Sequence, residues 1–479
     1  FFIILTPILS WAQNISLTHS GTLYDASENP VQKSFQVDFS RKYQITILPA
    51  LSSFIYFKGE GAIPFKKLLF NTSSSRTDIS NIILGDANSN KINLNLNLYL
   101  FNFRIFKNVK YNKELGFSLQ LKDEAYGNIT DETFVLLDSY RNFPSSSYQN
   151  ILNNNAENQS YWQLSVNYRE DYNNTWAFGG RFSLLDGITY NKIDIETSSL
   201  QIYRNNTYEI PITGKYVSSF GLGRFENKNL IPDLKNMGAA VSSGVSYTSR
   251  KGTYLTLNVK DLGFIHWAKQ TSYYNFTDTI EGTNTNQVRS NFFNGSGKPT
   301  DINEVNKSYN SLIDTKIDFA ASKNFEFYTP VFLLSKSVFN QNGQMALLNN
   351  FRKNAFVFSF NPIYDFRTKW RLGSQLLIQS PNTEFYVGSE SILSSYQLAK
   401  GFIKNDPSIG GSPKANFYIG FNVKFGRMMQ TIGNADDLLS LNDKETGFVV
   451  RLSNKDKRAA QKSNKQIENR RKKNNKRNN

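Results

Sequence analysis

The chain has 479 residues, of which 39% are hydrophobic and 14% aromatic, with no cysteine and a formal net charge of +16. The missing cysteine excludes disulfides and thiolate metal sites. The mean hydropathy of −0.45 is too low for a bundle of membrane-spanning helices. The many Phe, Tyr, Asn and Ser residues instead suit pleated strands, turns and polar lumens.

The first residues resemble an export signal. Residues 1–9 are almost wholly apolar, and the small residues Ser10 and Ala12 match the −3 and −1 positions that signal peptidase requires. We therefore expect a truncated signal peptide over 1–12. After residue 13 no run of 18 apolar residues occurs, so an exported chain of this kind is periplasmic, secreted or an outer-membrane barrel.

The body of the chain alternates between apolar and polar residues. In 416–425, for example, Phe417, Ile419 and Phe421 alternate with asparagine and glycine, and 92–100, 162–169 and 176–184 behave alike. Side chains of a strand point to opposite faces with a period of two, so each segment has one apolar and one polar face. A soluble sandwich has the same alternation, but its strands average about five or six residues.

Two features favour a transmembrane antiparallel β-barrel over a sandwich. The alternating segments are long, and many carry aromatic residues at their ends, as the interfacial girdles of membrane barrels do. The candidate girdle residues are Phe101, Phe103, Tyr168, Trp176, Tyr190, Trp267, Trp370 and Phe425. The sequence therefore predicts an all-β fold in the cell outer membrane.

We expect fourteen strands, an even number that leaves both chain ends in the periplasm. The predicted strands are 44–57, 92–105, 114–122, 161–169, 175–188, 192–204, 207–217, 239–249, 252–262, 328–339, 353–363, 369–379, 383–390 and 415–426. Sixteen strands are the alternative, because 311–320 also alternates. The segments 106–113, 170–174, 205–206, 250–251, 340–352, 364–368 and 380–382 are then short connections, and 58–91, 123–160, 218–238, 263–327 and 391–414 long extracellular loops.

We expect the barrel to span 44–426. A periplasmic leader or plug is expected before it, at 13–43, and a periplasmic basic tail after it, at 427–479. The tail is expected to be largely disordered from 454, since it has almost no apolar residues. Residues 455–479 hold 11 Lys or Arg and 2 Asp or Glu, so +9 of the +16 charge lies there. No nucleic-acid partner is expected in the periplasm; peptidoglycan or a partner protein is the expected contact of the tail.

Three motifs resemble segments of an uncharacterised family of Bacteroidota outer-membrane proteins. They are Asp261 to Trp267, Gly179 to Gly187 and Phe385 to Ser391. In addition, Asn29-Pro30 resembles the Asn-Pro-Ala box of fatty-acid-transporter-like barrels, with Val31 in place of alanine. The resemblance covers most of 29–426. It implies a fourteen-stranded barrel that either passes apolar molecules or holds secretion partners, and it assigns no functional residue.

The sequence contains no pattern of catalytic or metal-binding residues. Its two histidines, His19 and His266, are too few for a zinc site without cysteine. No nucleophile elbow accompanies His266, and we expect it at the membrane interface beside Trp267. The acidic pairs 123–124 and 131–132 are expected to be solvated loop residues. We therefore expect no enzyme, no cofactor and no catalytic, cofactor-binding or metal residues, while ligand-binding residues stay unassigned.

Two functions follow from this sequence as expectations. In the first, the barrel passes small apolar or amphipathic molecules. In the second, it is a non-transporting scaffold subunit of an envelope secretion, motility or surface-protein complex. Besides outer-membrane lipid, the expected partners differ between the two: the first needs only a small-molecule cargo, and the second needs other envelope proteins.

Overall fold

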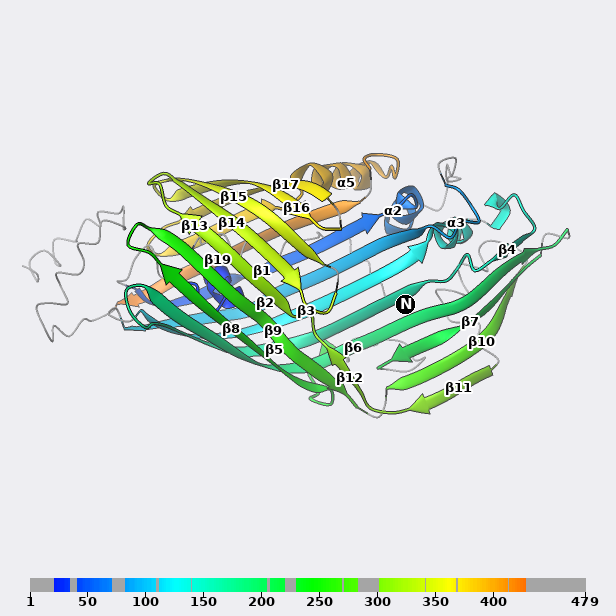
Figure 1. Ribbon diagram of the computed structural model, residues 1–479, viewed down its shortest axis with the longest axis horizontal. Coiled ribbons are helices and arrows are strands. Elements are labelled where there is room, and N and C mark those ends of the chain that lie inside the picture. The colour runs from blue at the N-terminus through cyan, green and yellow to red at the C-terminus, as the bar shows by residue number, and fades with distance from the viewer. Residues whose placement is uncertain are drawn as a thin grey trace, which may run out of the picture. The chain divides into compact units, whose positions relative to one another are not determined.

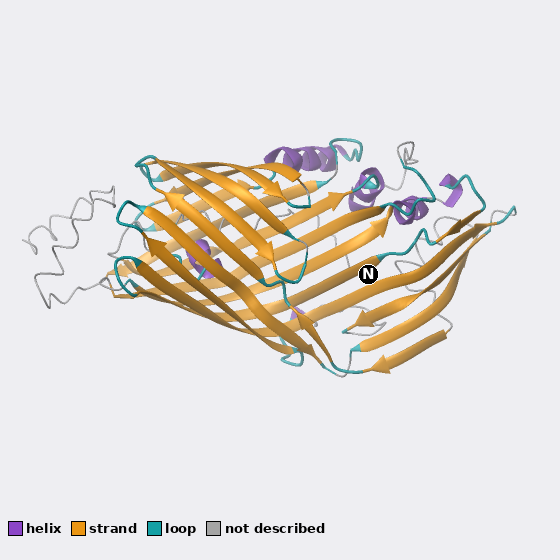
Figure 2. Cartoon of the chain, viewed as in Figure 1, coloured by secondary structure: helices purple, strands orange, loops and turns teal. Residues whose placement is uncertain are grey.

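The computed structural model describes residues 21–34, 41–70, 82–108, 112–138, 140–204, 207–219, 230–268, 271–282, 301–340, 342–367, 369–411 and 413–427. The signal peptide predicted for 1–12 and residues 428–479 of the predicted tail lie outside them. The described chain is mostly strand, and its strands pair into one sheet that closes on itself (Figures 1 and 2). Among the described residues, no helix is long and apolar enough to cross a membrane.

The closed wall is a fourteen-stranded antiparallel β-barrel, which confirms the predicted fold and strand number. It closes where the first and last strands pair, from Arg41 opposite Arg427 to Tyr56 opposite Lys414. In order the wall strands are β1 (Arg41–Lys58), β2 (Ser89–Asn108), β3 (Lys113–Thr130), β5 (Asn155–Asp171), β6 (Trp176–Ile202), β8 (Met237–Thr248), β9 (Thr253–Trp267), β13 (Lys316–Lys323), β14 (Tyr328–Ser337), β15 (Gly343–Lys353), β16 (Phe356–Asp365), β17 (Lys369–Gln379), β18 (Thr383–Ser389) and β19 (Lys414–Arg427).

Two predicted strands are not separate members of this wall. The prediction split 175–188 from 192–204, but β6 runs through both without a turn. The first half of β6 pairs with β8 and its second half with β7 (Tyr208–Ser218), which leaves the wall. No glycine or proline occurs between 188 and 202, so nothing in the chain breaks the strand there.

Two wall strands take their place. β13 overlaps the segment 311–320, the predicted alternative, and β15 covers most of 340–352, for which the prediction of a connection is wrong. Alternation does not reveal β15, because apolar residues occupy both of its faces. Ala346 and Leu348 are buried, whereas Met345 and Leu347 are exposed, so the contrast that reveals a strand by its period of two is absent.

The two ends of the barrel differ in their connections. At the end that holds Arg41 and Arg427, here called the near end, each connection has two to four residues. Most of the connections at the opposite, far end are long, although the links β14–β15 and β16–β17 are short. The far end also carries α2 (Ala62–Phe70), α3 (Asp131–Asp138), η2 (Tyr140–Asn142), β4 (Ser147–Gln149) and α5 (Ile392–Lys404).

A side sheet leaves the wall at the far end. It joins the second half of β6 to β7, β10 (Ser272–Gly282) and β11 (Asp301–Asn306), while β12 (Tyr309–Leu312) pairs with the end of β9. Tyr190 and Trp267, predicted to be interfacial, are instead fully buried where this sheet diverges, with ring centroids 5.5 Å apart. They close the junction that the diverging strands would otherwise leave open.

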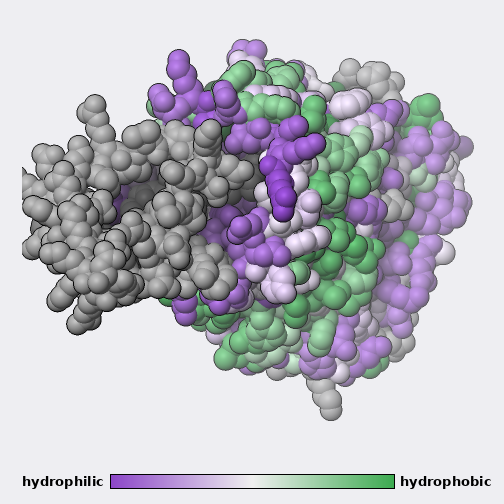
Figure 3. Space-filling model, turned by 60° about the vertical axis from the view of Figure 1, so that its left-hand side comes forward, coloured by the Kyte–Doolittle hydropathy of each residue, from purple (hydrophilic) through white to green (hydrophobic). Residues whose placement is uncertain are grey.

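The wall has an apolar outside and a polar inside, as the alternation predicted. On β5, Leu164, Val166 and Tyr168 are exposed, whereas their neighbours Gln163, Ser165, Asn167 and Arg169 are buried. Figure 3 shows a hydrophobic area across the visible barrel wall, bordered by hydrophilic side chains. A belt of exposed apolar side chains on a closed sheet is the arrangement that suits lipid.

Candidate functional site

Residues 21–34, here called the plug, lie inside the lumen toward the near end, where they contact Arg104, Glu114 and Gln379. Its helix α1 (Leu23–Glu28) begins at Thr22, whose hydroxyl accepts the Asp25 N–H at 3.1 Å, and ends at Asn29 in an extended conformation. A helix of six residues is unstable alone in water. It forms here because every residue of α1 is buried against the wall.

Three arginines of the wall hold the backbone of the plug. Arg104 donates to the Ala26 carbonyl at 2.7 Å, Arg181 to the Ser27 carbonyl at 2.6 Å and Arg169 to the Val31 carbonyl at 2.8 Å. The carbonyls at the end of a helix carry partial negative charge, which a guanidinium complements. The plug is thus fixed by wall residues from β2, β5 and β6.

Each of these buried arginines has a carboxylate partner. Arg104 lies 2.8 Å from Glu114, Arg169 2.5 Å from Asp171 and Arg181 2.6 Å from Asp261. Removing one member of such a pair leaves an uncompensated buried charge, which is strongly destabilising. The pairs therefore make the arginines tolerable inside the barrel and hold them in place for the plug.

Asp261 is the most heavily shared of these carboxylates. It also accepts from Lys122 at 2.6 Å and from Gln163 at 3.1 Å. Its backbone has a φ of +54°, and the register of β8 and β9 shifts next to it. The resulting bulge turns the carboxylate into the lumen, where it connects β3, β5, β6 and β9.

The plug also contributes a carboxylate, that of Glu28, which bonds to wall residues. Glu28 accepts from Asn97 at 2.7 Å and from the Tyr99 hydroxyl at 2.6 Å, and it pairs with Lys260. At the first residue of α1, the Leu23 N–H donates to Glu384 at 3.1 Å. Glu384 pairs with Lys424 at 2.6 Å. Both ends of α1 are therefore bound to charged wall residues.

The backbone of the plug lies directly against a glycine of the wall, Gly179. A Cβ atom at Gly179 would lie 2.2 Å from the Pro30 carbonyl oxygen, which is far inside van der Waals contact. Gly179, Arg181 and Asp261 come from the sequence motifs that suggested a family, and Pro30 comes from the Asn-Pro pair. The structure brings these motifs, which lie far apart in the sequence, together around one contact.

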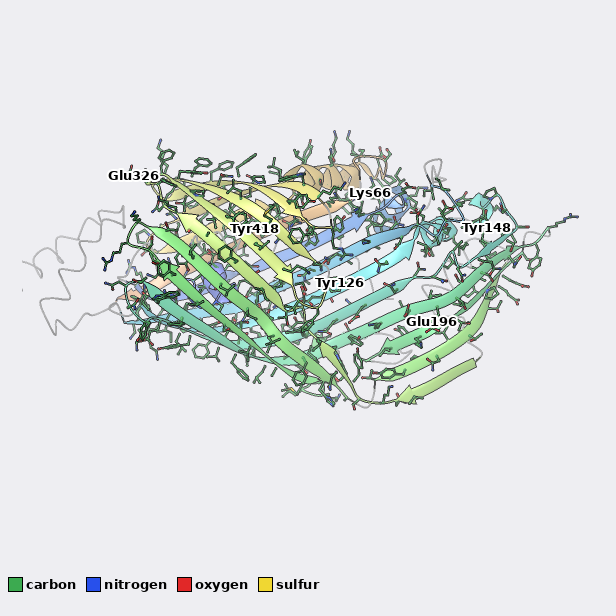
Figure 4. The ribbon with its side chains drawn as sticks, in the orientation of Figure 1. Lys66, Tyr126, Tyr148, Glu196, Glu326 and Tyr418 are labelled. Carbon is green, nitrogen blue, oxygen red and sulfur yellow. The ribbon has the colours of Figure 1, made fainter. Side chains whose placement is uncertain are left out.

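A cavity lies beside the plug, on the far-end side of Lys260. Together with the solvent at its open side it encloses about 820 Å³. Tyr126, labelled in Figure 4, reaches it from β3. The other lining residues are largely polar or charged: Phe54, Tyr56, Asn93, Asn95, Lys260, Asp314, Lys316, Asp318, Ser335, Ser337, Asn342, Gly343, Gln344, Asp365, Arg367, Arg371, Glu390 and Asn416.

A helix covers the wall beside this cavity. β18 ends at Ser389, so the first residues of β17 and β19 have no strand between them. There Ser395 of α5 exchanges hydrogen bonds with the backbone of Asn416, at 3.0 and 3.1 Å. Ala415, whose side chain points to the lipid side like that of Phe417, is buried. The helix therefore packs on the outer face of the wall at this point.

The candidate residues named from sequence are not gathered into a site. His19 lies outside the described residues, and His266 is exposed and hydrogen-bonded to Asn310 at 2.7 Å. The pair 123–124 is not in a loop but in β3, and 131–132 begins α3. Within the described ranges, no group of three or more His, Cys, Asp or Glu side chains could hold a metal ion.

The predictions from the sequence do not include the buried charged residues of the lumen that bind the plug. Arg104, Glu114 and Glu384 are buried charged residues on membrane-spanning strands. Such residues are rare and costly within a membrane and usually face a partner or a pathway. Their occurrence on the polar face of an alternating segment was the signal that could have identified them.

A family described as being of unknown function, DUF5723, matches residues 36–390. The chain belongs to this family. The DUF5723 match covers wall strands β1 to β18 and ends before α5. No curated protein matches the sequence.

Several solved barrels resemble this DUF5723 protein. The Pseudomonas putida toluene transporter TodX is 8% identical, with a TM-score of 0.41 over 87% of this chain and 97% of that one. A Pseudomonas aeruginosa FadL homologue is 10% identical, with a TM-score of 0.40 over 86% and 95%. The translocator domain of the Neisseria meningitidis autotransporter NalP is 7% identical, with a TM-score of 0.33 over 86% and 100%. The barrel assignment itself rests on the strand pairing described above.

Proposed function

We propose that this protein lies in the outer membrane of a Gram-negative bacterium and passes small apolar or amphipathic molecules, with its near end in the periplasm. The observation that carries this proposal is the arrangement of the lumen: a cavity toward the far end, and the plug between this cavity and the near end. A barrel with such a plug can admit cargo without leaving an open pore.

The lining of the cavity favours amphipathic cargo over purely apolar cargo. Charged and amide side chains surround the aromatic residues Phe54, Tyr56 and Tyr126. A wholly apolar molecule would leave those polar groups desolvated and unpaired, which costs free energy. The toluene transporter TodX supports passage by its similarity alone, and no catalytic arrangement is part of the proposal.

The test fixes the plug in place. The chain lacks cysteine, so the double variant Ser27→Cys/Asn102→Cys introduces one pair at a contact where the two side chains are 2.9 Å apart. In proteoliposomes, we expect uptake of a fluorescent neutral amphipath by the reduced variant and its loss after oxidation. The native chain treated with the same oxidant is the control. Equal uptake by oxidised and reduced protein would argue against passage through the plugged lumen.

The second candidate function is a scaffold in an envelope complex. It is favoured by the side sheet of β7, β10 and β11, which leaves the wall although it is not needed to close the barrel. A contact of the basic tail with peptidoglycan or a periplasmic protein belongs to this candidate. It predicts co-purification with other envelope proteins at a fixed ratio. Deleting 454–479 without any loss of cell-wall co-sedimentation would count against the tail contact.

A further inference from the structure

The cavity contains buried polar atoms that the protein itself does not satisfy. The Tyr56 hydroxyl, the Asn416 Nδ2 group and the Asn93 Oδ1 atom have no hydrogen-bond partner within the described structure. Tyr56 and Asn416 are 3% and 1% exposed, and all three residues line the cavity. A buried polar group without a partner costs about 1–3 kcal/mol, so these groups favour a ligand that completes them.

The charged residues of the cavity already compensate one another. Arg371 lies 3.3 Å from Glu390 and 3.6 Å from Asp365, and Lys316 lies 3.2 Å from Asp314. Lys260 pairs with Glu28 of the plug. The lining holds four basic and four acidic side chains. A ligand with a net charge would add an unmatched charge to this balanced set, which low-dielectric surroundings disfavour.

The unsatisfied neutral groups include both donors and acceptors. An amide NH2 donates, an amide oxygen accepts and a phenol does both. A ligand hydroxyl group also donates and accepts, so it can pair with any of the three. Beside them, the rings of Phe54 and Tyr56 lie nearly parallel, with centroids 6.1 Å apart and 9° between their planes. These rings, with Arg371 over Phe54 and Lys414 over Tyr56, give the cavity some apolar contact area next to its hydrogen-bonding groups.

We propose that this cavity binds the neutral, hydroxyl-rich head group of an amphipathic molecule, that is, a glycoside. The sugar hydroxyls pair with Tyr56, Asn93 and Asn416, and C–H groups of the sugar contact the rings of Phe54 and Tyr56. The assignment of an amphipath rests on the proposed function, whereas binding of the head group can be measured without any transport.

The test measures binding of octyl glucoside, below its critical micelle concentration, to the full chain in lipid nanodiscs. Octanoate and octyltrimethylammonium carry the same tail with a charged head. We expect saturable binding of the glucoside and binding of both charged amphipaths that is at least tenfold weaker. Equal or tighter binding of a charged amphipath, or no saturable binding of the glucoside, would overturn the proposal.

Two variants separate the cavity from general lipid effects. Tyr56→Phe removes a hydroxyl that has no partner in the protein, so the fold should tolerate it, and we expect about fivefold weaker glucoside binding. Tyr386→Phe is the matched control, since the Tyr386 hydroxyl is also buried and unpartnered but does not line the cavity. Unchanged binding by Tyr56→Phe, or an equal loss in both variants, would contradict the assignment. If uptake fails but glucoside binding is intact, the proposed transport is refuted and the proposed glycoside site still stands.

Discussion

Arg181 on β6 lies 2.6 Å from Asp261 on β9, and the same guanidinium donates to the Ser27 carbonyl of the plug at 2.6 Å. One ion pair inside the barrel therefore links two wall strands that are not neighbours to the plug. The pair is almost completely buried, and it is one of several contacts that hold the plug.

Asp261→Asn should be strongly destabilising. The change leaves the positive charges of Arg181 and Lys122 without their shared carboxylate, and breaking a buried pair in this way costs about 3–5 kcal/mol. The measurement is the denaturant midpoint of the refolded barrel in detergent. The control is Asp233→Asn, which removes the partner of Lys235 in an exposed pair and should cost less than about 1 kcal/mol. Similar midpoints for the two variants would contradict this role of Asp261.

Gly179→Ala should displace the plug. The added methyl group would lie 2.2 Å from the Pro30 carbonyl oxygen, so either the plug or β6 must move, and the plug has no strand pairing to hold it. We expect ion conductance in planar bilayers, and we expect none from the native protein. Gly180→Ala is the neighbouring control, because its methyl group meets nothing within 4 Å. Conductance in both variants, or in neither, would be inconsistent with the contact.

Phe360→Arg should destabilise the barrel if its apolar belt faces lipid. Phe360 lies midway along β16 and is 45% exposed, and an arginine at the middle of the membrane costs about 2–4 kcal/mol in barrels of this type. Tyr172→Arg, in a near-end turn, is the control and should cost about 0–1 kcal/mol. Folding titrations into phospholipid vesicles give both values. Equal costs would mean that β16 does not cross the hydrocarbon region.

Lys66→Met should loosen the loop that follows α5. The Lys66 ammonium group donates to the carbonyls of Ile409 and Gly410 at 3.1 and 2.9 Å, and burial lowers its pKa. Without these bonds, we expect amide hydrogens of 405–411 to exchange at least several-fold faster, while those of the wall strands stay protected. Lys400→Met, an exposed change on α5, should leave exchange in this loop unaltered. Unchanged exchange in Lys66→Met would show that other contacts hold the loop.

The sequence by itself determined that this chain is a barrel with an apolar outside and a polar inside. The reason is local: a period of two is visible in any single segment, as in Leu164, Val166 and Tyr168 against their polar neighbours. It also predicted the strand number, although through compensating assignments. β6 was divided in two and β7 was counted in the wall, while β13 and β15 were left out.

Only the tertiary structure decided what fills the barrel. Whether β6 pairs with β7 or β8 at a given residue depends on partners elsewhere in the chain, and so does the burial of Tyr190 against Trp267. The bond between Arg181 and Ser27 joins residues 154 positions apart. A single segment does not show such a partner. The sequence of one strand specifies which of its side chains are polar and face the lumen. Closure of the sheet decides which residues from other strands and from the plug lie opposite them.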